Sequence, residues 1–438
     1  MADVRPFRGV TYDPGRVDLA SVLSPPYDVI SPQQQQAYYE RDPHNAVRIV
    51  LNRAAGDARY AEAARDLQAW LAEGILRRDV EPSFYVHRET FDVPGAAGPT
   101  PMDRVGLLAA VRLEPWSSGA IKPHEHTMPG PKLDRLSLMR ATRADTEPIW
   151  VFHPDHNREL LAALEAIVAA PPDMKATLHP VPNVDGEESV ETHELWRVWY
   201  PATVARLAAA ASAAQLYIAD GHHRYETALH HAAEVGGGPD EATRFKVMLL
   251  SAVEDPGLFV LPTHRLVRLP AGRTLGEFLG GLVGWGWTSE QPASFEDLVA
   301  RLQRPSPTGA LGFGLLAERR YTYLEGRVPA AEIAGLAPTV AALDVGLLHQ
   351  GVLRPLLGIG PEELAAGALV AYSRDAREVK ARVTRGDFDL GILTRAPSLE
   401  QVQAVADAGQ NMPQKSTYFW PKPASGLVMM LQPPGESV

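Results

Sequence analysis

The chain has 438 residues and a formal net charge of −11, with 45% hydrophobic and 22% charged residues. This length suggests two or more domains, and the apolar content is enough for a large core. An acidic chain without a basic run is a poor match for a phosphate backbone, so we expect no nucleic-acid partner. The chain has no cysteine, which excludes disulfides, thiolate metal sites and cysteine nucleophiles.

The ends and the apolar stretches of the chain show no targeting signal. Residues 1–13 lack the apolar segment of a secretory leader, and no window approaches about 18 uninterrupted apolar residues. We therefore expect a cytoplasmic protein with no membrane partner.

Apolar periodicity predicts alternating strands and helices in the first two thirds of the chain. The expected strands are residues 44–52, 83–93, 104–113, 148–153, 215–219, 245–253 and 258–267. The expected helices are residues 59–76, 160–169, 202–213 and 225–235. Residues 83–93 and 104–113 read as a strand pair joined by a loop that contains proline and glycine.

Residues 289–307 are the best candidate for a linker, although residues 295–302 could form a helix within them. Beyond them, strands at 369–372 and 388–393 alternate with helices at 376–383 and 399–408. The fold class is α/β (α+β) with mixed sheets. We expect an N-terminal domain over residues 1–288 and a second α/β domain over residues 308–438.

The segment from Asp220 to Arg224 reads Asp-Gly-His-His-Arg and follows a predicted strand. Gly221 permits a sharp turn, and the helical spacing that follows places the segment at a helix N-terminus. Backbone amides and the helix dipole attract an anion at that position, and an arginine can hold phosphate oxygens through two hydrogen bonds. We predict a phosphate site at Gly221, His222, His223 and Arg224.

A metal site is the rival interpretation of the same helix. His222, Glu226 and His230 recur at intervals of four residues, and His124 and His126 form a second pair. Imidazole is the commonest metal ligand, but no known metal motif is complete here. A metal-dependent hydrolase therefore stays open as an alternative.

Residues 122–135 carry many ionisable side chains and three prolines, which predict a loop rather than a regular helix or central strand. Glu125 is a candidate general base for a hydroxyl substrate, whose proton must be accepted during attack on phosphorus. Lys132 and Arg135 could hold phosphates or a substrate carboxylate. A solvated charged loop is the alternative.

Residues 24–32 form a stiff, proline-rich turn that leads into a helix. Ser31 is a good N-cap and Pro32 a good first helical residue. These roles leave Tyr27 and Asp28 unexplained, and this pair could bind a substrate amine or a metal.

Residues 412–422 lie near the C-terminus. Lys415 is followed by Ser416 and Thr417, a combination that suits phosphate binding, but no glycine pattern of a P-loop precedes it. The alternative is a β-strand anchored by the aromatic residues 418–420.

Six motifs together resemble a bacterial and archaeal family, the domain-of-unknown-function family one-zero-one-five. The set is specific in combination and spans nearly the whole chain. The motifs are Arg-Pro-Phe at 5–7, Pro-Pro-Tyr-Asp-Val at 25–29, His-Glu-x-Thr at 124–127, Asp-Gly-His-His-Arg at 220–224, Pro-Thr-His-Arg at 262–265 and Met-Pro-x-Lys-Ser-Thr at 412–417.

The Asp-Gly-His-His-Arg motif also resembles the nucleotide-phosphate box of the ParB/sulfiredoxin superfamily, which implies a ParB/sulfiredoxin-like nucleotide-binding core. Sulfiredoxin chemistry needs a cysteine that this chain lacks. ParB partition proteins need a basic DNA-binding helix-turn-helix, which the sequence does not show. The free serine kinases look closest, and they transfer a phosphoryl group from ATP or ADP to the hydroxyl of free L-serine.

That resemblance implies roles for the candidate residues. Glu125 is the expected base, residues 222–224 hold the nucleotide phosphates, and Mg²⁺ bridges phosphate oxygens with Asp220 as ligand or orienting group. His223 joins Glu125 and Asp220 as a catalytic candidate, and residues 412–423 could return to the site. The remaining substrate-binding candidates are Tyr27, Asp28, His124, Thr127, Lys132 and Arg135.

The expected partners are a nucleotide and a small metabolite, most directly a free amino acid, and the chain could pair as a homodimer. A nucleotide-binding regulatory protein without catalysis is the alternative from a different functional class.

Overall fold

The computed structural model describes residues 1–94, 100–127, 129–179, 181, 190–304, 306–307, 309–317 and 319–438. The chain divides into two compact units. The first unit contains Met1–Pro123, Thr127–Leu258 and Pro421–Val438, and the second contains His124–His126 and Phe259–Trp420. The expected mixed α/β class is confirmed, since both units combine helices with sheets.

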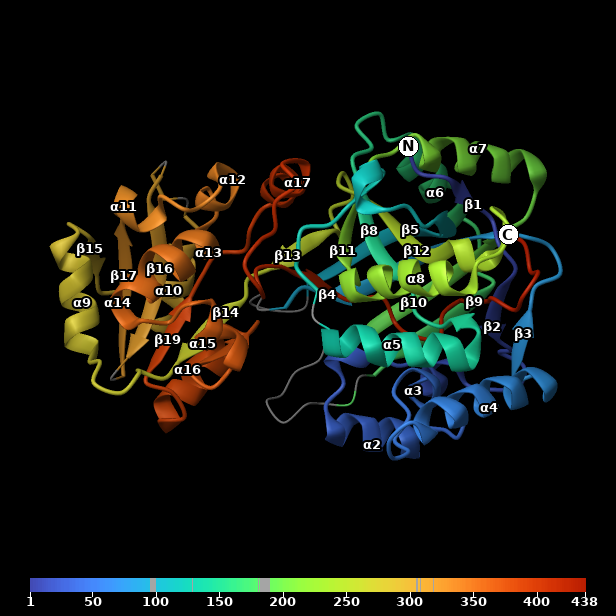
Figure 1. Ribbon diagram of the computed structural model, residues 1–438, viewed down its shortest axis with the longest axis horizontal. Coiled ribbons are helices and arrows are strands. Elements are labelled where there is room, and N and C mark those ends of the chain that lie inside the picture. Colours follow the sequence, from blue (N-terminus) through green and yellow to red (C-terminus); the bar gives the residue numbers. More distant parts are fainter. Residues whose placement is uncertain are drawn as a thin grey trace. The chain divides into compact units, whose positions relative to one another are not determined.

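A large mixed sheet dominates the first unit (Figure 1). Its strands are β1 (Val4–Arg5), β4 (Phe84–Asp92), β5 (Pro101–Arg112), β6 (Ile121–Lys122), β8 (Ile149–His153), β9 (Met174–Leu178), β10 (Glu191–Val198), β11 (Leu216–Asp220) and β12 (Phe245–Ala252). The strand order is β6-β11-β8-β12-β5-β4-β10-β9, with β1 paired to β5. The β6–β11 and β8–β12 pairs are parallel, whereas β4 pairs antiparallel with both β5 and β10.

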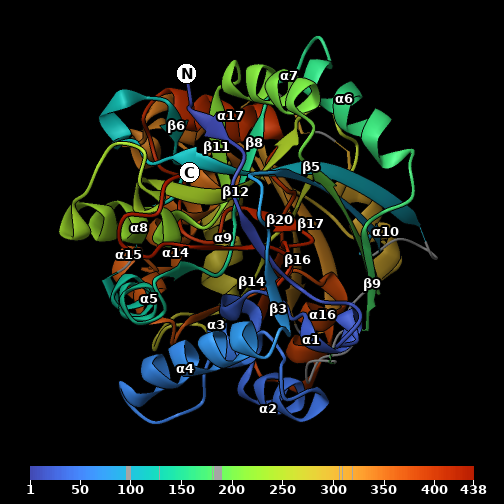
Figure 2. The same cartoon turned by 90° about the vertical axis from the view of Figure 1, so that its right-hand side faces the viewer.

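A four-stranded sheet completes the strands of the first unit, in the order β3-β2-β21-β7. These strands are β2 (Gly9–Tyr12), β3 (Leu76–Arg78), β7 (Ala144–Asp145) and β21 (Met429–Leu431). Figure 2 shows β3 beside α4 (Ala58–Ala72), the helix that precedes it in the chain. The strand β21 comes from the C-terminal segment, so residues distant in sequence share this sheet.

The first unit contains helices and 3₁₀ turns as well as sheets. They are α1 (Leu19–Val22), the 3₁₀ turns Tyr27–Val29, Trp116–Ser118 and Ala242–Arg244, α2 (Pro32–Arg41), α3 (Val47–Val50), α4, α5 (Pro129–Thr142), α6 (Glu159–Val168), α7 (Pro201–Ser212) and α8 (His222–Val235). Leu160 and Leu164 of α6 and Leu207 of α7 are buried in the main apolar cluster with Val86 and Leu107 of the sheet. Helices α4, α5 and α8 lie side by side (Figure 1).

The second unit is built on an antiparallel sheet in the order β15-β17-β16-β19-β14-β18. Its strands are β14 (His264–Val267), β15 (Thr288–Glu290), β16 (Leu311–Ala317), β17 (Arg320–Gly326), β18 (Val370–Ser373) and β19 (Leu390–Leu393), with β13 (Phe259–Leu261) and β20 (Tyr418–Trp420) as a separate pair. Its helices are α9 (Leu275–Gly284), α10 (Phe295–Leu302), α11 (Ala330–Ile333), α12 (Pro338–Ala341), α13 (Asp344–Gly346), a π-helix (Leu347–Leu353), α14 (Arg354–Leu357), α15 (Pro361–Ala366), α16 (Ala376–Arg385) and α17 (Leu399–Asp407).

The expected strand over residues 44–52 is wrong, because Val47–Val50 form the short helix α3. The β-branched residues there suggested a strand. Asn45 instead accepts a hydrogen bond from the Val47 amide at 3.0 Å and donates to Ser21 O at 2.8 Å. This buried asparagine starts a helical turn, so tertiary hydrogen bonds override the local propensity.

The expected loop over residues 122–135 is wrong in its second half, where helix α5 begins at Pro129. Pro129 and Pro131 lie in the first helical turn, where the backbone N–H groups have no acceptor within the helix. Proline therefore costs little at these positions, and Lys132 and Arg135 lie on a helix.

Residues 289–307, expected as a linker, belong to the second unit. Thr288–Glu290 form an edge strand, and the expected helix over residues 295–302 is confirmed as α10. Phe295, Leu298 and Leu302 of this helix are buried. The long segment of the first unit ends at residue 258 and that of the second unit begins at residue 259, whereas the expected boundary lay between residues 288 and 308.

Candidate functional site

The candidate site in the first unit is the turn from β11 into α8. Gly221 joins the two elements with φ +104°, a conformation that residues with a side chain rarely adopt. Gly221 is the N-cap residue of α8 and has no side chain with which to cap the helix. The Gly221 carbonyl accepts from the Tyr225 amide at 2.9 Å, which is the first hydrogen bond of the helix. The turn thus presents the amide end of a 14-residue helix directly after the sheet.

Asp220 ends β11 and is held by two cations. Its Oδ2 accepts from Arg224 Nη2 at 2.6 Å, and its Oδ1 lies 2.7 Å from Lys422 Nζ. Lys422 Nζ also donates to Asp28 Oδ2 at 2.5 Å. One lysine therefore links three of the sequence motifs, those at 25–29, 220–224 and 412–422.

The charges of this cluster determine its protonation. Burial raises the pKa of the Asp220 carboxyl, but Lys422 and Arg224 outweigh that effect and hold the pKa well below its usual range. Burial acts to lower the pKa of the Arg224 guanidinium. The carboxylates of Asp220 and Glu147 outweigh burial and hold that pKa above its ordinary value. Both groups are consequently ionised at any physiological pH.

Arg224 is buried and already engaged by the protein. Its Nη1 donates to the Pro148 carbonyl, and its Nη2 donates to Asp220. A guanidinium has five N–H donors, so these bonds use two of them. In this position Arg224 fixes the Asp220 carboxylate and adds positive charge at the start of α8.

Tyr27 and Asp28 lie in a 3₁₀ turn beside this cluster. The Tyr27 amide donates to Glu147 Oε1 at 3.2 Å, and the Arg135 guanidinium stacks 3.8 Å from the centre of the Tyr27 ring. Burial raises the pKa of the Tyr27 phenol to about 12, although Arg135 and Arg224 act against it. Within this unit, Asp28 accepts a hydrogen bond from the amine of Lys422.

Arg135 is a structural centre rather than an exposed cation. Its Nη1 donates to Val50 O at 2.8 Å and to Glu147 Oε2 at 3.2 Å, and its Nη2 donates to Asp134 Oδ2 at 2.5 Å. Ser425 of the C-terminal segment donates to the other oxygen of Glu147 at 3.0 Å. These bonds fix the Tyr27 turn against helix α5.

Thr127 and Lys132 converge on Glu226 in the first turns of α8. Thr127 Oγ1 donates to Glu226 Oε2 at 2.6 Å, and Lys132 Nζ donates to the same oxygen at 2.8 Å. Burial raises the pKa of Glu226, but the hydrogen bonds from Lys132 and Thr127 lower it below its ordinary value. In this arrangement Glu226 joins α5 to α8.

The metal interpretation of α8 is not supported within the described residues. Eight residues at 100° per residue bring His230 about 80° away from His222 around the helix. His222 is buried, whereas His230 is exposed and lies 3.1 Å from Glu234. Among the described residues, one group of histidine and carboxylate side chains is arranged to hold an ion, and it consists of Glu89, Glu191 and His193.

The second unit brings together residues 124–126 and residues 411–417. His124 is buried, and its Nε2 lies 3.1 Å from Thr417 Oγ1. The Met412 amide donates to His124 O at 2.8 Å, and Asn411 Nδ2 lies 3.3 Å from the His126 ring nitrogens. Glu125 lies between these two histidines and is half-buried.

Lys415 is exposed at the tip of this cluster and has φ +56°. Its carbonyl accepts from Arg265 Nη2 at 3.2 Å, and Ser416 Oγ donates to the Pro413 carbonyl. Arg265 is fully buried, and its other donors reach His349 Nε2 and the Thr263 carbonyl. Arg265 thus supports the backbone that carries Lys415.

Three residues of these clusters were not predicted as site residues from the sequence. Lys422 lies within residues 412–422, and its position between two prolines was the signal available in the sequence. Glu147 precedes a proline in the same way. Arg265 belongs to the motif at 262–265, and its hydrogen bond to Lys415 O gives it a structural role.

Comparison with protein-family models matches residues 4–346 to the family described as "Protein of unknown function (DUF1015)". A search of the curated proteins finds no match.

Several solved structures resemble the chain at low identity. A free serine kinase in complex with AMP matches 75% of this chain and 92% of its own, with 14% identity and a TM-score of 0.36. A conserved hypothetical protein from Pyrococcus furiosus matches 72% and 91%, with 12% identity and a TM-score of 0.33. SbnI from Staphylococcus aureus, truncated at its C-terminus, matches 76% and 85%, with 11% identity and a TM-score of 0.33.

Proposed function

The chain belongs to the DUF1015 family, whose function is unknown, and we propose that it is a nucleotide-dependent phosphotransferase acting on the hydroxyl of a small metabolite. Free L-serine is the acceptor we favour, and ATP or ADP is the donor. Because TM-scores below 0.5 do not establish a shared fold, we argue the activity from the residues of this chain. The carrying observation is the glycine turn at the N-terminus of α8 with Arg224 and Lys422 beside it.

Phosphate oxygens suit this turn for two reasons. Backbone amides at a helix N-terminus point outward, and the helix dipole favours negative charge there. Gly221 has no side chain, and the Arg224 guanidinium lies 3.2 Å from the position that a Cβ would take. We assign the phosphate contacts to Gly221, His222 and His223, with Arg224 and Lys422 adding positive charge.

Magnesium fits the same cluster through Asp220. Mg²⁺ prefers oxygen ligands and in phosphotransferases is held by one or two carboxylates together with substrate phosphates. Asp220 is ionised at physiological pH, and each of its oxygens retains a lone pair beside its bond to Lys422 or Arg224. A bound Mg²⁺ would neutralise charge that develops on the phosphoryl group.

Glu125 is the base in this proposal. The attacking hydroxyl forms a P–O bond while the P–O bond to the nucleotide breaks, and the hydroxyl proton passes to the Glu125 carboxylate. Lys415 supplies charge from its exposed position in the same unit as Glu125. Nucleotide or substrate contacts remain assigned to His223, Ser416, Thr417, His124 and Thr127.

The direct test is product formation. Purified full-length protein is incubated with L-serine, Mg²⁺ and either ATP or ADP, and phosphoserine is measured by mass spectrometry. We expect phosphoserine with at least one nucleotide. Absence of phosphoserine with both nucleotides removes serine as the acceptor, and a panel of other small hydroxyl compounds then tests the phosphotransferase class itself.

Glu125→Gln separates the base from the binding residues. We expect unchanged nucleotide affinity and a turnover reduced by about 10²–10⁴-fold, which is the usual range for a general base. Glu332→Gln is the matched control, because Glu332 is exposed on α11 of the same unit. An unaltered rate in Glu125→Gln would remove this residue from the base role.

A nucleotide-binding protein without catalysis is the second candidate. The observation that favours it is that Asp220 and Arg224 each bond to two protein groups, which suits a fixed binding frame. This alternative predicts nucleotide binding by calorimetry with no phosphorylated product, and a Glu125→Gln variant that resembles the wild type in every measurement.

A further inference from the structure

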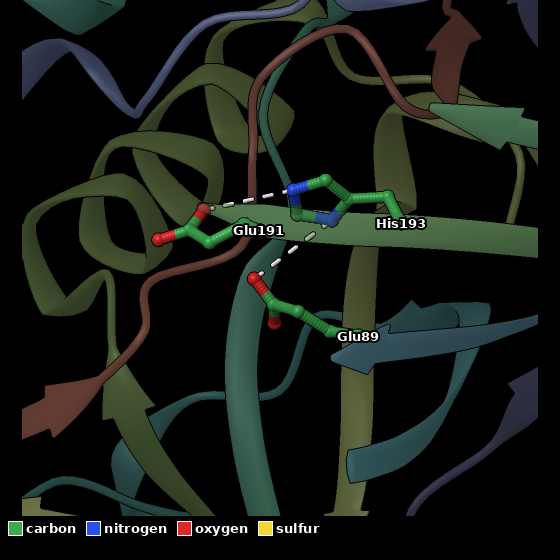
Figure 3. Close-up of side chains that lie close together, drawn as sticks. All are labelled: Glu89, Glu191 and His193. Atoms are coloured by element: carbon green, nitrogen blue, oxygen red, sulfur yellow. Dashed lines mark ion pairs between the residues drawn. The ribbon is translucent and has the colours of Figure 1, made fainter. Parts of the chain in front are cut away.

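Two adjacent strands of the first unit carry mirrored polar pairs on one face. Strand β4 has His87 and Glu89 two residues apart, and strand β10 has Glu191 and His193 two residues apart. The strands are antiparallel, and His193 lies directly opposite Glu89. Because side chains alternate between faces along a strand, all four point to the same side of the sheet. Figure 3 shows Glu89 and Glu191 approaching different nitrogens of the His193 ring.

This polar group is buried almost completely. The exposed fraction is 0% for Glu89, 2% for His193 and 1% for His87. Isolated ionisable groups are costly to bury, and native structures normally pair them. Arg104, also buried, meets this requirement for one oxygen of Glu89 by donating to Oε2.

One oxygen of Glu89 and one nitrogen of His193 are not satisfied by hydrogen bonds. Among the described residues, Glu89 Oε1 and His193 Nε2 are buried atoms without a hydrogen bond. Glu89 Oε1 lies 3.8 Å from His193 Nδ1, and Glu191 Oε2 lies 3.6 Å from His193 Nε2. Both separations exceed the length of a hydrogen bond. Two carboxylates and an imidazole therefore lie close together without hydrogen bonds between them.

His87 determines which nitrogen of His193 is available. Its Nε2 lies 3.1 Å from His193 Nδ1, with the two rings stacked. When His193 Nδ1–H donates to His87, the lone pair of His193 Nε2 is left available on the side of Glu191. Metal-binding histidines are commonly oriented in this way by a hydrogen bond from the second ring nitrogen.

We propose that Glu89, Glu191 and His193 bind one divalent transition-metal ion, with Zn²⁺ and Mn²⁺ as the favoured species. One ligand atom from each of the three residues lies within 4.8 Å of the others. Mixed imidazole and carboxylate ligands suit these ions, whereas Mg²⁺ prefers oxygen ligands and retains several waters. Glu191 is the most exposed ligand, with 15% of its side chain accessible, and marks the side from which an ion enters.

This metal site is separate from the proposed nucleotide site. Four strand intervals separate β4 from β11 in the sheet order, which corresponds to about 19 Å. The metal proposal therefore does not depend on the phosphotransferase proposal, and it can be tested without a nucleotide.

The test uses full-length protein stripped with EDTA and then titrated with Zn²⁺, Mn²⁺ or Co²⁺ in the absence of nucleotide. Calorimetry measures stoichiometry, and the visible absorption of Co²⁺ reports its ligands. We expect one ion per chain in the wild type. Absence of stoichiometric binding of all three ions would overturn the proposal before any variant is made.

Two variants locate the bound ion. Loss of an outer-shell partner weakens metal binding by up to about 100-fold, so Glu191→Gln, which removes a ligand, should weaken it by at least that factor. His193→Gln should abolish the Co²⁺ spectrum. Glu194→Gln on the opposite face of β10 should leave binding unchanged. Circular dichroism confirms that each variant is folded, and Glu191, at the accessible edge, is the substitution that the fold tolerates best. Ion binding that survives both ligand substitutions would place the ion elsewhere and contradict the assignment.

Discussion

Lys422 Nζ lies 2.7 Å from Asp220 Oδ1 and ties the end of strand β11 to the C-terminal segment of the chain. The same ammonium reaches Asp28 at 2.5 Å. Lys422 is thus the common partner of two carboxylates that come from distant parts of the sequence. Its removal would leave the Arg224 guanidinium to balance the charge of Asp220.

Lys422→Gln should destabilise the first unit and weaken nucleotide binding. Loss of a hydrogen bond between charged groups costs about 1.5–3 kcal/mol. Urea unfolding and nucleotide titration measure the two effects. A double-mutant cycle with Asp28→Asn provides the control, because coupling between the two substitutions isolates their contact. Additive effects would show that Lys422 does not act through Asp28.

Gly221→Ala should disturb the turn more than an ordinary substitution at positive φ. An added Cβ would meet the Arg224 guanidinium at 3.2 Å. Gly119→Ala is the matched control, since Gly119 has φ +68° and nothing within 4 Å of the added Cβ. We expect the control to lose about 1–2 kcal/mol of unfolding free energy and Gly221→Ala to lose more. Nucleotide affinity should fall in Gly221→Ala alone, and equal affinity in both variants would argue against phosphate binding at this turn.

The second unit should lose stability as the pH falls below about 6.5, the ordinary pKa of histidine. Burial lowers the pKa of His264 to about 3, with Arg265 adding to the effect. Between these two values the unfolded chain binds a proton that the folded chain does not, so the free energy of unfolding decreases towards acid. The contribution is on the order of a few kcal/mol and is complete near pH 3.

His264→Asn tests this assignment. His264 Nδ1 accepts from the Thr394 amide at 3.2 Å, and an asparagine Oδ1 can replace that acceptor without titrating. Unfolding in urea between pH 4 and pH 7 should depend less on pH in the variant than in the wild type. Identical pH dependence would assign the acid sensitivity to other groups, such as buried His349, whose pKa is also lowered by burial.

Lys415→Gly separates the charge of Lys415 from its backbone. Lys415 has φ +56°, which glycine adopts at less cost, so the unfolding free energy should stay constant or rise by up to about 1 kcal/mol. Under the phosphotransferase proposal, turnover should fall because the ammonium is lost. Lys415→Asn is the control, since asparagine also tolerates this conformation and is neutral. Full turnover in both variants would exclude a role for the ammonium.

Local patterns predicted much of the fold. The expected strand pair over residues 83–93 and 104–113 is confirmed as β4 and β5, and the expected strand followed by a helix around Asp220 is confirmed as β11 and α8. The expected N-cap at Ser31 is confirmed, since its side chain accepts from the Gln34 amide. These features depend on neighbours within a few residues, which a single sequence displays.

The errors arose where tertiary contacts decide the local structure. The turn at α3 depends on hydrogen bonds from Asn45 to Ser21 O and Leu23 O, which no local window contains. The helix α5 was missed because proline was weighed as a helix breaker without regard to its place in the first turn. In the candidate site, the residue types at positions 27–28 and 220–224 drew attention, but only the fold reveals that Lys422 joins them. The group of Glu89, Glu191 and His193 was missed because its two pairs are about a hundred residues apart.

The placement of residues 421–438 in the first unit affects how the protein is made. Strand β21 lies between β2 and β7, so the four-stranded sheet cannot close until the ribosome has synthesised Met429–Leu431. The second unit comes almost entirely from residues 259–420 and leaves the ribosome earlier as a nearly continuous segment. During synthesis, therefore, the unit that begins first is the one that finishes last.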